Sequence, residues 1–166
     1  YETYTRLNIT GAYLAMQTHL QNTWQSRSED LPLTTPYEAL ILASIIEKET
    51  GTESDRAHIA GVFINRLRKG MKLQTDPTII YGLGEQFDGN LRKKDLLADQ
   101  AYNTYTRAGL PPTPIALPSL ASIRAALNPA ETDALYFVAK GNGESEFSTN
   151  LADHNKAVNK YQKQQK

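Results

Sequence analysis

The chain has 166 residues, 18 basic and 18 acidic side chains, and no cysteine. Its length suits one domain with its own hydrophobic core, and its neutral charge argues against nucleic acid or a membrane surface as a partner held by bulk charge. The lack of cysteine excludes a disulfide scaffold, a thiolate metal site and a cysteine nucleophile.

The histidines and the apolar segments narrow the possible functions further. His19, His58 and His154 lack the spacing of a metal-binding motif, so we expect no metal ion and no cofactor. No run of apolar residues is long enough to cross a bilayer. Because the chain opens abruptly at Tyr1, we expect it to be part of a longer protein whose targeting or anchoring segment lies upstream.

The first helix is expected at residues 9–26, where apolar side chains recur at helical spacing but form an imperfect face. This face contains Tyr13, Leu14, Met16, Gln17, Leu20 and Trp24. A proline-containing loop at residues 31–36 follows, and either Thr34 or Thr35 can cap the helix after it.

Two more helices are expected before residue 71. The second helix is closed by Gly51, a residue type common just after a helix end. The third begins at Thr52 or Ser54 and ends at a lysine–glycine pair. Because the connection between them is so short, these two helices must pack as a hairpin or a corner.

Glu49 is the most unusual residue of the second helix. The apolar stripe of this helix contains Ile41, Leu42, Ile45 and Ile46. At about 100° per residue Glu49 falls on that stripe, whereas Glu47 and Lys48 are expected to be solvated. Glu38 also lies near the stripe, but it stands in the first turn, where the helix dipole explains a carboxylate. Burial and the dipole of the last turn both raise the pKa of Glu49, and general-acid chemistry needs an acid that is still protonated near neutral pH. The alternative is a helix-end glutamate whose carboxyl group reaches water.

Residues 71–119 are rich in Gly, Pro, Tyr, Asn and Thr. We expect ordered loops with short helices, one of them near residues 94–97, that together form a cleft. Aromatic rings, amides and carboxylates are the groups that bind sugars. The candidates in this region are Gln74, Asp76, Tyr81, Tyr102, Asn103 and Tyr105. Loop tyrosines are also ordinary packing residues, and an Asp-Pro pair equally suits the start of a helix.

The last third of the chain becomes regular again. We expect, in order, a helix at 120–127, a strand at 134–139, a hairpin turn at 141–143, a strand at 145–149 and a final helix that starts at Asn150 or Asp153. His154 and Asn155 on this helix either contact a substrate or hold the helix in place. The predicted fold class is therefore α+β, with mostly helices, one small antiparallel sheet and long ordered loops in a single domain at residues 1–166.

Several of these motifs, in this order, resemble a known family. They lie at residues 43–50, 62–67, 73–82, 102–105, 109–112, 114–115, 125–129, 135–139 and 154–155. Over about residues 36–160 the chain resembles the catalytic domain of the YceG-like (MltG) endolytic murein transglycosylases. The resemblance implies that Glu49, the second acid of the Glu-Lys-Glu motif, is catalytic. It also implies cleavage of peptidoglycan between N-acetylmuramic acid and N-acetylglucosamine without water, which leaves a 1,6-anhydro-muramyl end.

The same resemblance carries expectations about the rest of the protein. Members of the family typically have an N-terminal transmembrane helix and a LysM-like subdomain, which here would lie before Tyr1. The resemblance implies a place at the bacterial inner membrane, with the catalytic domain facing the periplasm. The implied partners are glycan strands of peptidoglycan and the synthases that make them.

Two departures and two alternatives complete the sequence-based predictions. The family usually has glycine at the position of Thr113, and often has histidine at the position of Ser145. One alternative is a hydrolytic muramidase in which Asp76 is a second carboxylate that activates water. The other is a glycan-binding module without activity, in which Glu49 merely closes a packed helix junction.

Overall fold

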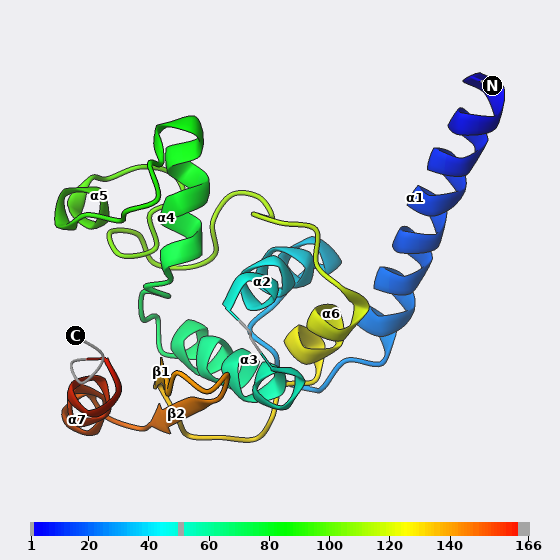
Figure 1. The fold of residues 1–166 in the computed structure, drawn as a ribbon. Helices are drawn as coiled ribbons and strands as arrows, with labels where there is room; N and C mark the ends of the chain where they lie inside the picture. Colours follow the sequence, from blue (N-terminus) through cyan, green and yellow to red (C-terminus); the bar gives the residue numbers. More distant parts are fainter. Residues whose placement is uncertain (1, 50–51, 163–166) are drawn as a thin grey trace.

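The computed structural model describes residues 2–49 and 52–162 and has the expected α+β architecture, with seven α-helices and one two-stranded sheet among those residues (Figure 1). The elements are α1 (Glu2–Gln25), α2 (Pro36–Glu49), α3 (Glu53–Arg68), α4 (Asp76–Leu83), the 3-10 helix η1 (Gly84–Gln86), α5 (Lys93–Leu97), α6 (Leu120–Leu127), β1 (Tyr136–Ala139), β2 (Ser145–Ser148) and α7 (Leu151–Tyr161).

The hydrophobic core lies where α2, α3 and α6 pack against one another (Figure 1). Its largest fully buried side chains include Leu42, Ile45, Ile46, Ile59, Phe63, Ile64 and Leu127. The predicted apolar stripe of α2 is confirmed, because Ile41 is buried together with the three α2 residues just named. Burial of such side chains is the main stabilising contribution to a domain of this size.

The starts of α2 and α3 follow the expected capping chemistry in part. The backbone N–H of Glu38 donates to the Thr35 hydroxyl at 3.2 Å, and the Glu38 carboxylate accepts from the backbone N–H of Thr34 at 2.6 Å. Both threonines are therefore used, in a reciprocal arrangement typical of a helix start. Thr52 precedes α3 without a side-chain cap, whereas Ser54 lies inside the helix. Gly51 lies outside the described residues.

Glu47 is not the solvated residue that the helical wheel suggested. Its carboxylate accepts hydrogen bonds from the backbone N–H and the hydroxyl of Ser119, at 3.0 and 2.7 Å, and from the hydroxyl of Ser122 at 2.5 Å. Ser119 is also the N-cap of α6, as its hydroxyl accepts from the backbone N–H of Ser122. These hydrogen bonds join the start of α6 to α2. The helical wheel could not predict them, because Ser119 is 72 residues away from Glu47 in the sequence.

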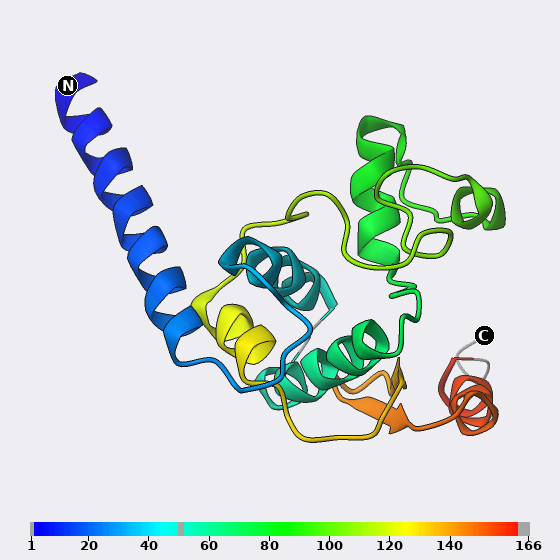
Figure 2. The ribbon, with the colours of Figure 1, turned by 180° about the vertical axis from the view of Figure 1, so that it is seen from behind.

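α1 is longer than predicted and projects from the rest of the molecule (Figures 1 and 2). Most of its predicted apolar face is not a packing face, because Tyr13, Leu14 and Met16 are exposed. Leu20 and Trp24, near its C-terminal end, do pack against the core. None of the helices described here, α1 included, is both long and apolar enough to cross a membrane.

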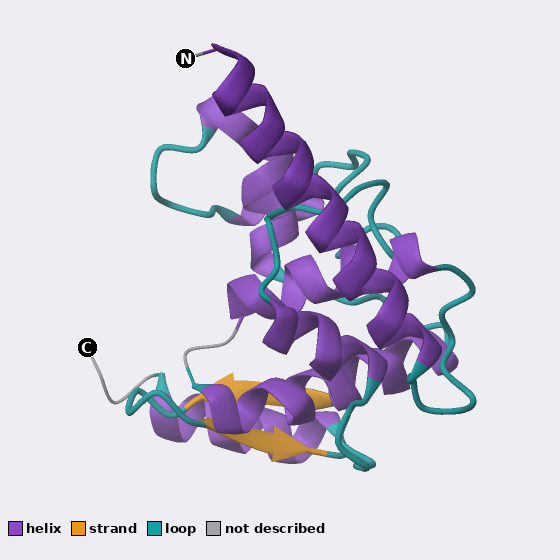
Figure 3. Cartoon of the chain, turned by 90° about the vertical axis from the view of Figure 1, so that its right-hand side faces the viewer, coloured by secondary structure: helices purple, strands orange, loops and turns teal. Residues whose placement is uncertain are grey.

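The hairpin of β1 and β2 lies between α3 and α7 (Figures 1 and 3). Phe137 of β1 meets Phe63 of α3 edge to face, with ring centroids 5.8 Å apart. α7 (Leu151–Tyr161) is capped by Asn150, one of its two predicted start residues, whose side chain accepts from the backbone N–H of Asp153 at 2.9 Å. The hairpin therefore connects α3 on one side with α7 on the other.

Candidate active site

A cavity of about 550 Å³ lies beside the C-terminal end of α2. Its lining comes from six parts of the chain, namely α2, α3, the segment leading into α4, the loop around Tyr105, the hairpin and α7. The polar and charged lining residues are Glu49, Arg66, Gln74, Asp76, Tyr105, Tyr136, Ser145, His154, Asn155 and Gln162. Of the sequence-predicted candidates, the structure thus brings Glu49 together with Gln74, Asp76, Tyr105, His154 and Asn155.

Glu49 is only partly exposed at the wall of this cavity. Burial, the largest effect, raises the pKa of its carboxyl group, and the nearby charge of Asp76 raises it further. A hydrogen bond from the hydroxyl of Thr75 and the positive charge of Arg66 act in the opposite direction without cancelling the rise. The expected inward position of Glu49 is therefore what the structure has, and its protonated form is favoured relative to a free glutamate.

Arg66 of α3 is the permanent cation of the cavity wall and is only 7% exposed. Its Nε donates to the carbonyl oxygen of Leu135 at 2.7 Å, and its Nη1 donates to that of Leu73 at 2.6 Å. The guanidinium also lies over the ring of Tyr136, 5.1 Å from its centroid. These contacts compensate the burial of the charge and join α3 to β1 and to the segment before α4.

Asp76 and Tyr105 form a hydrogen-bonded pair in the cavity. The Tyr105 hydroxyl donates to Oδ1 of Asp76 at 2.5 Å. Burial and this acceptor hold the pKa of Tyr105 above its usual range, so its hydroxyl stays a neutral donor. Asp76 opens α4 with Pro77 directly after it, close to the helix start that its sequence predicts.

His154 of α7 stacks on Tyr136, with ring centroids 5.1 Å apart and an interplanar angle of 24°. Burial, and then the charge of Arg66, lower the pKa of His154, so its neutral form is favoured at neutral pH. Its Nδ1 is buried without a hydrogen-bond partner among the described residues. Asn155, next to it, is exposed and lines the cavity.

Three sequence-predicted candidates are not in this cavity. Asn103 is fully buried; its Nδ2 donates to the carbonyl oxygen of Ala98 at 2.6 Å, and its Oδ1 accepts from the backbone N–H of Tyr105 at 2.8 Å. The prediction that Asn103 contacts substrate is therefore wrong for this structure, because its amide organises the loop. The rings of Tyr81 and Tyr102 contact each other outside the cavity lining, with centroids 4.8 Å apart and an interplanar angle of 59°.

The two departures from the family pattern have different surroundings. Ser145 lines the cavity, so the position where the family often has histidine does face the site. Thr113 lies outside the cavity lining, and its hydroxyl is 2.9 Å from that of Tyr102.

The sequence-based prediction missed Arg66, Tyr136 and Thr75. Arg66 falls at helical spacing with the buried residues Ile59 and Phe63 of α3, and a charge on a buried stripe is the same signal that singled out Glu49. Tyr136 and Thr75 gave no such signal, because their roles depend on chain segments that meet only in the folded molecule.

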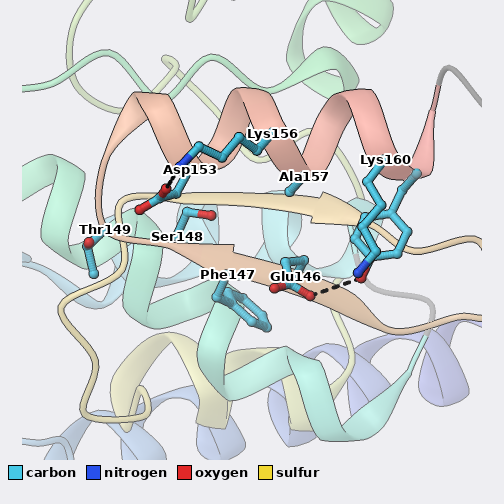
Figure 4. A pocket seen from close by; sticks show the side chains of 9 residues that line it. Glu146, Phe147, Ser148, Thr149, Asp153, Lys156, Ala157 and Lys160 are labelled. Carbon is cyan, nitrogen blue, oxygen red and sulfur yellow. Dashed lines mark hydrogen bonds and ion pairs between the residues drawn. The ribbon is translucent and has the colours of Figure 1, made fainter.

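A second hollow, of about 350 Å³, lies between β2 and α7 and shares no lining residue with the first (Figure 4). Its charged groups pair with neighbours: Lys156 lies 2.8 Å from Asp153, and Glu146 accepts from the Tyr161 hydroxyl at 3.2 Å. These charges are satisfied on the surface, so the Glu49 cavity is the better candidate for chemistry.

Comparisons with known proteins agree with the family resemblance seen in the sequence. The YceG-like family matches residues 1–160. The chain is 51% identical over 125 residues to the endolytic murein transglycosylase of Bacillus subtilis (strain 168), covering 75% of this chain and 34% of that protein. It is 38% identical over 126 residues to the protein of the same name from Streptococcus pneumoniae serotype 2 (strain D39 / NCTC 7466), covering 73% of this chain and 23% of that one.

A solved structure gives the same result for the fold. A yceG-like protein from Listeria monocytogenes superposes with a TM-score of 0.68 at 47% sequence identity, over 74% of this chain and 39% of that one. The chain thus spans about a third or less of the length of the curated relatives it matches. Because the match to the YceG-like family extends over residues 1–160 of this chain, the chain belongs to that family.

Proposed function

We propose that this chain is the catalytic part of an endolytic murein transglycosylase. The proposed reaction cleaves the bond between N-acetylmuramic acid and N-acetylglucosamine within nascent glycan strands, leaves a 1,6-anhydro-muramyl end and so terminates strand elongation. The names of the B. subtilis and S. pneumoniae relatives support this activity. The observation that carries it is the inward carboxyl group of Glu49, whose pKa is raised by burial at the wall of a cavity.

In the proposed mechanism Glu49 acts twice. Its protonated form first donates to the glycosidic oxygen as the bond to the anomeric carbon breaks through an oxocarbenium-like state. The resulting carboxylate then accepts the proton of the muramyl 6-hydroxyl as that oxygen bonds to the anomeric carbon. Because the nucleophile belongs to the substrate, this route needs neither water nor a second catalytic carboxylate.

The polar groups around Glu49 are suited to holding a sugar. Gln74 and Asn155 offer amide donors and acceptors, and Tyr105 offers a neutral hydroxyl. Arg66 supplies a fixed positive charge for a carbonyl or carboxylate oxygen of the muramyl group. Contacts from Asp76, His154 and the Tyr81–Tyr102 pair to the glycan remain predictions.

The test compares Glu49→Gln with Glu85→Gln, the same change at an exposed glutamate on η1. Purified proteins are incubated with native glycan strands, and the products are weighed by mass spectrometry. We expect wild type and Glu85→Gln to release anhydro-muramyl ends, and Glu49→Gln to lose cleavage by a factor of about 10² or more while keeping its fold. Cleavage by Glu49→Gln at the wild-type rate would contradict the proposal.

The same products distinguish the hydrolytic alternative. Asp76 lines the same cavity and its charge reaches Glu49, so a second carboxylate is close to the proposed acid. Hydrolysis adds one water to each product, and transglycosylation adds none. Products without the added water would exclude a muramidase, and Asp76→Asn would then reduce binding or rate without changing product mass.

A non-catalytic glycan-binding module makes the opposite prediction. It would bind strands equally well in wild type and Glu49→Gln, with no turnover of native strands by either protein. Turnover by wild type alone supports the enzyme.

We further propose that the domain works beside the synthases that make its substrate strands, at the inner membrane and facing the periplasm. The support is the family resemblance together with the murein substrate named for the relatives. Crosslinking in cells, followed by identification of captured synthases, tests this placement.

A further inference from the structure

Thr75 connects the Glu49 cavity to the start of α4. It is the residue before α4 and is 2% exposed. Its hydroxyl donates a short hydrogen bond to Oε1 of Glu49, and among the described residues it makes no other hydrogen bond. Glu49 lies 26 positions earlier in the chain, so this contact joins the end of α2 to the start of α4.

The backbone of Thr75 is held from two sides. Its N–H donates to the Thr104 hydroxyl at 3.1 Å, and its carbonyl oxygen accepts from the Thr78 hydroxyl at 2.7 Å. The two hydroxyls of Thr78 and Thr104 are 2.9 Å apart and buried. Gln74, the residue before Thr75, has a left-handed backbone conformation with φ of 50°. Its backbone N–H donates to the carbonyl oxygen of Thr104 at 3.0 Å. A buried network that is satisfied in this way fixes the direction of the Thr75 side chain.

We propose that Thr75 is a positioning residue that binds Oε1 of Glu49 and thereby leaves the transferable proton on Oε2. The proposal rests on the function proposed above. A threonine hydroxyl has a single hydrogen to donate, and here that hydrogen is directed at one of the two carboxyl oxygens. The other oxygen is then the one that exchanges a proton with substrate.

This assignment accounts for the proton at each step. Oε2 gives its proton to the glycosidic oxygen, which also takes the electron pair of the breaking bond. Oε2 then takes the proton of the 6-hydroxyl as that oxygen bonds to the anomeric carbon. Thr75 remains a donor to Oε1 throughout and stabilises the carboxylate between the two steps, because hydrogen bonds to charged acceptors are strong.

Other groups facing Glu49 also influence its titration. Arg66 from α3 and Asp76 from α4 act on it through their charges, in opposite directions. Tyr105, Tyr136 and His154 line the same cavity from the loop, the hairpin and α7. A substitution at Thr75 leaves all five unchanged, so a change in the titration of Glu49 reports on the hydroxyl.

The test replaces Thr75 with valine, which removes the hydroxyl at nearly constant size, and with serine, which retains it. Thr18→Val on α1 makes the same chemical change at an exposed site. Two quantities are measured in each protein: the pH midpoint of the Glu49 carboxyl by ¹³C NMR, and the pH profile of kcat/KM and kcat on native glycan strands. Thermal unfolding verifies that each variant folds.

Loss of the donor destabilises the carboxylate, so Thr75→Val is expected to move the Glu49 midpoint, and the alkaline limb of the activity profile, to higher pH. We also expect kcat at the optimum pH to fall about tenfold, and Thr75→Ser to restore both quantities. An unchanged Glu49 midpoint in folded Thr75→Val, or a serine variant that behaves like valine, would overturn the proposal. If Thr75→Val fails to fold, Thr75→Ala provides the same comparison.

The two proposals fail in different ways. If the wild-type protein does not cleave glycan, the proposed function is wrong, but the NMR titration still decides whether Thr75 holds the Glu49 carboxyl. If wild type cleaves glycan and the Thr75 variants titrate and react as wild type does, the function stands and the role of Thr75 is refuted.

Discussion

At the scale of single residues, Glu49 is held where its ionised form is disfavoured. Burial raises its pKa above the ordinary 4.5, and the negative charge of Asp76 adds to the rise. The folded protein therefore keeps a proton at pH values where the unfolded chain has released it. By linkage, the contribution of Glu49 to the free energy of unfolding decreases as the pH rises from about 4.5 towards the raised pKa, because unfolding then releases a proton.

Replacing Glu49 with glutamine should therefore stabilise the protein at neutral pH. We expect the free energy of unfolding to increase by about 1 kcal/mol at pH 7, and the gain to shrink as the pH falls to 4. Urea unfolding at both pH values measures this difference, with Glu85→Gln, the same change at an exposed glutamate, as the control. A gain of equal size at both pH values would argue against a raised pKa.

At the scale of elements, the end of α2 serves two neighbours. The Glu47 carboxylate accepts hydrogen bonds from Ser119 and Ser122 at the start of α6. Glu49, two residues later, accepts a hydrogen bond from the hydroxyl of Thr75, the residue before α4. Successive acids near a helix end point to different sides of it, so one carboxylate has a structural role and the other faces the cavity. The hydrogen bond from Ser122, and then those from Ser119, lower the pKa of Glu47.

Glu47→Ala should loosen the contact between α2 and α6. We expect a loss of about 1–3 kcal/mol in the free energy of unfolding at pH 7, because the donors lose a charged acceptor. Since the pKa of Glu47 is lowered by folding, its contribution is present above about pH 4.5 and is lost as the pH falls below it. Urea unfolding at pH 7 and pH 3 measures this, and Lys48→Ala, an exposed neighbour, serves as the control. Equal losses for the two variants would show that the Glu47 contacts add nothing.

At the scale of the whole molecule, the core of α2, α3 and α6 supports three peripheral parts: the projecting α1, the segment that contains α4 and α5, and the hairpin with α7 (Figures 1 and 2). The cavity forms where two of these parts approach the ends of α2 and α3. α1 takes no part in the cavity lining, and its packing on the core involves Leu20 and Trp24.

This arrangement predicts that α1 contributes to stability only through its C-terminal part. Trp24→Ala should lower the free energy of unfolding by about 2 kcal/mol, because a partly buried ring is lost. Leu14→Ala, at a side chain that is 55% exposed, should change it by less than about 0.5 kcal/mol. Thermal and urea unfolding of the two variants give the comparison, and a large loss from Leu14→Ala would mean that this face of α1 is covered.

Much of the fold was predictable because its signals are local. Periodicity identified the stripe of α2 and the inward position of Glu49, and the local pattern placed the helix at 120–127 and the start of the last helix at Asn150 or Asp153. The glycine-rich turn placed the hairpin. The amino acids within a few positions of one another decide such features, since helix caps, turns and apolar stripes depend on the spacing of neighbours.

The sequence by itself therefore determined the fold class and most of the elements, and it singled out Glu49 as the candidate acid of the proposed site. Only the tertiary structure decided what surrounds that acid: it brought Arg66, Tyr136 and His154 to one wall, buried Asn103 inside its loop and directed the Thr75 hydroxyl at Glu49. It also gave Glu47 a partner on α6. The physical reason is that these hydrogen bonds and ring contacts join segments distant along the chain, and they form only when packing of the core has fixed where each segment lies.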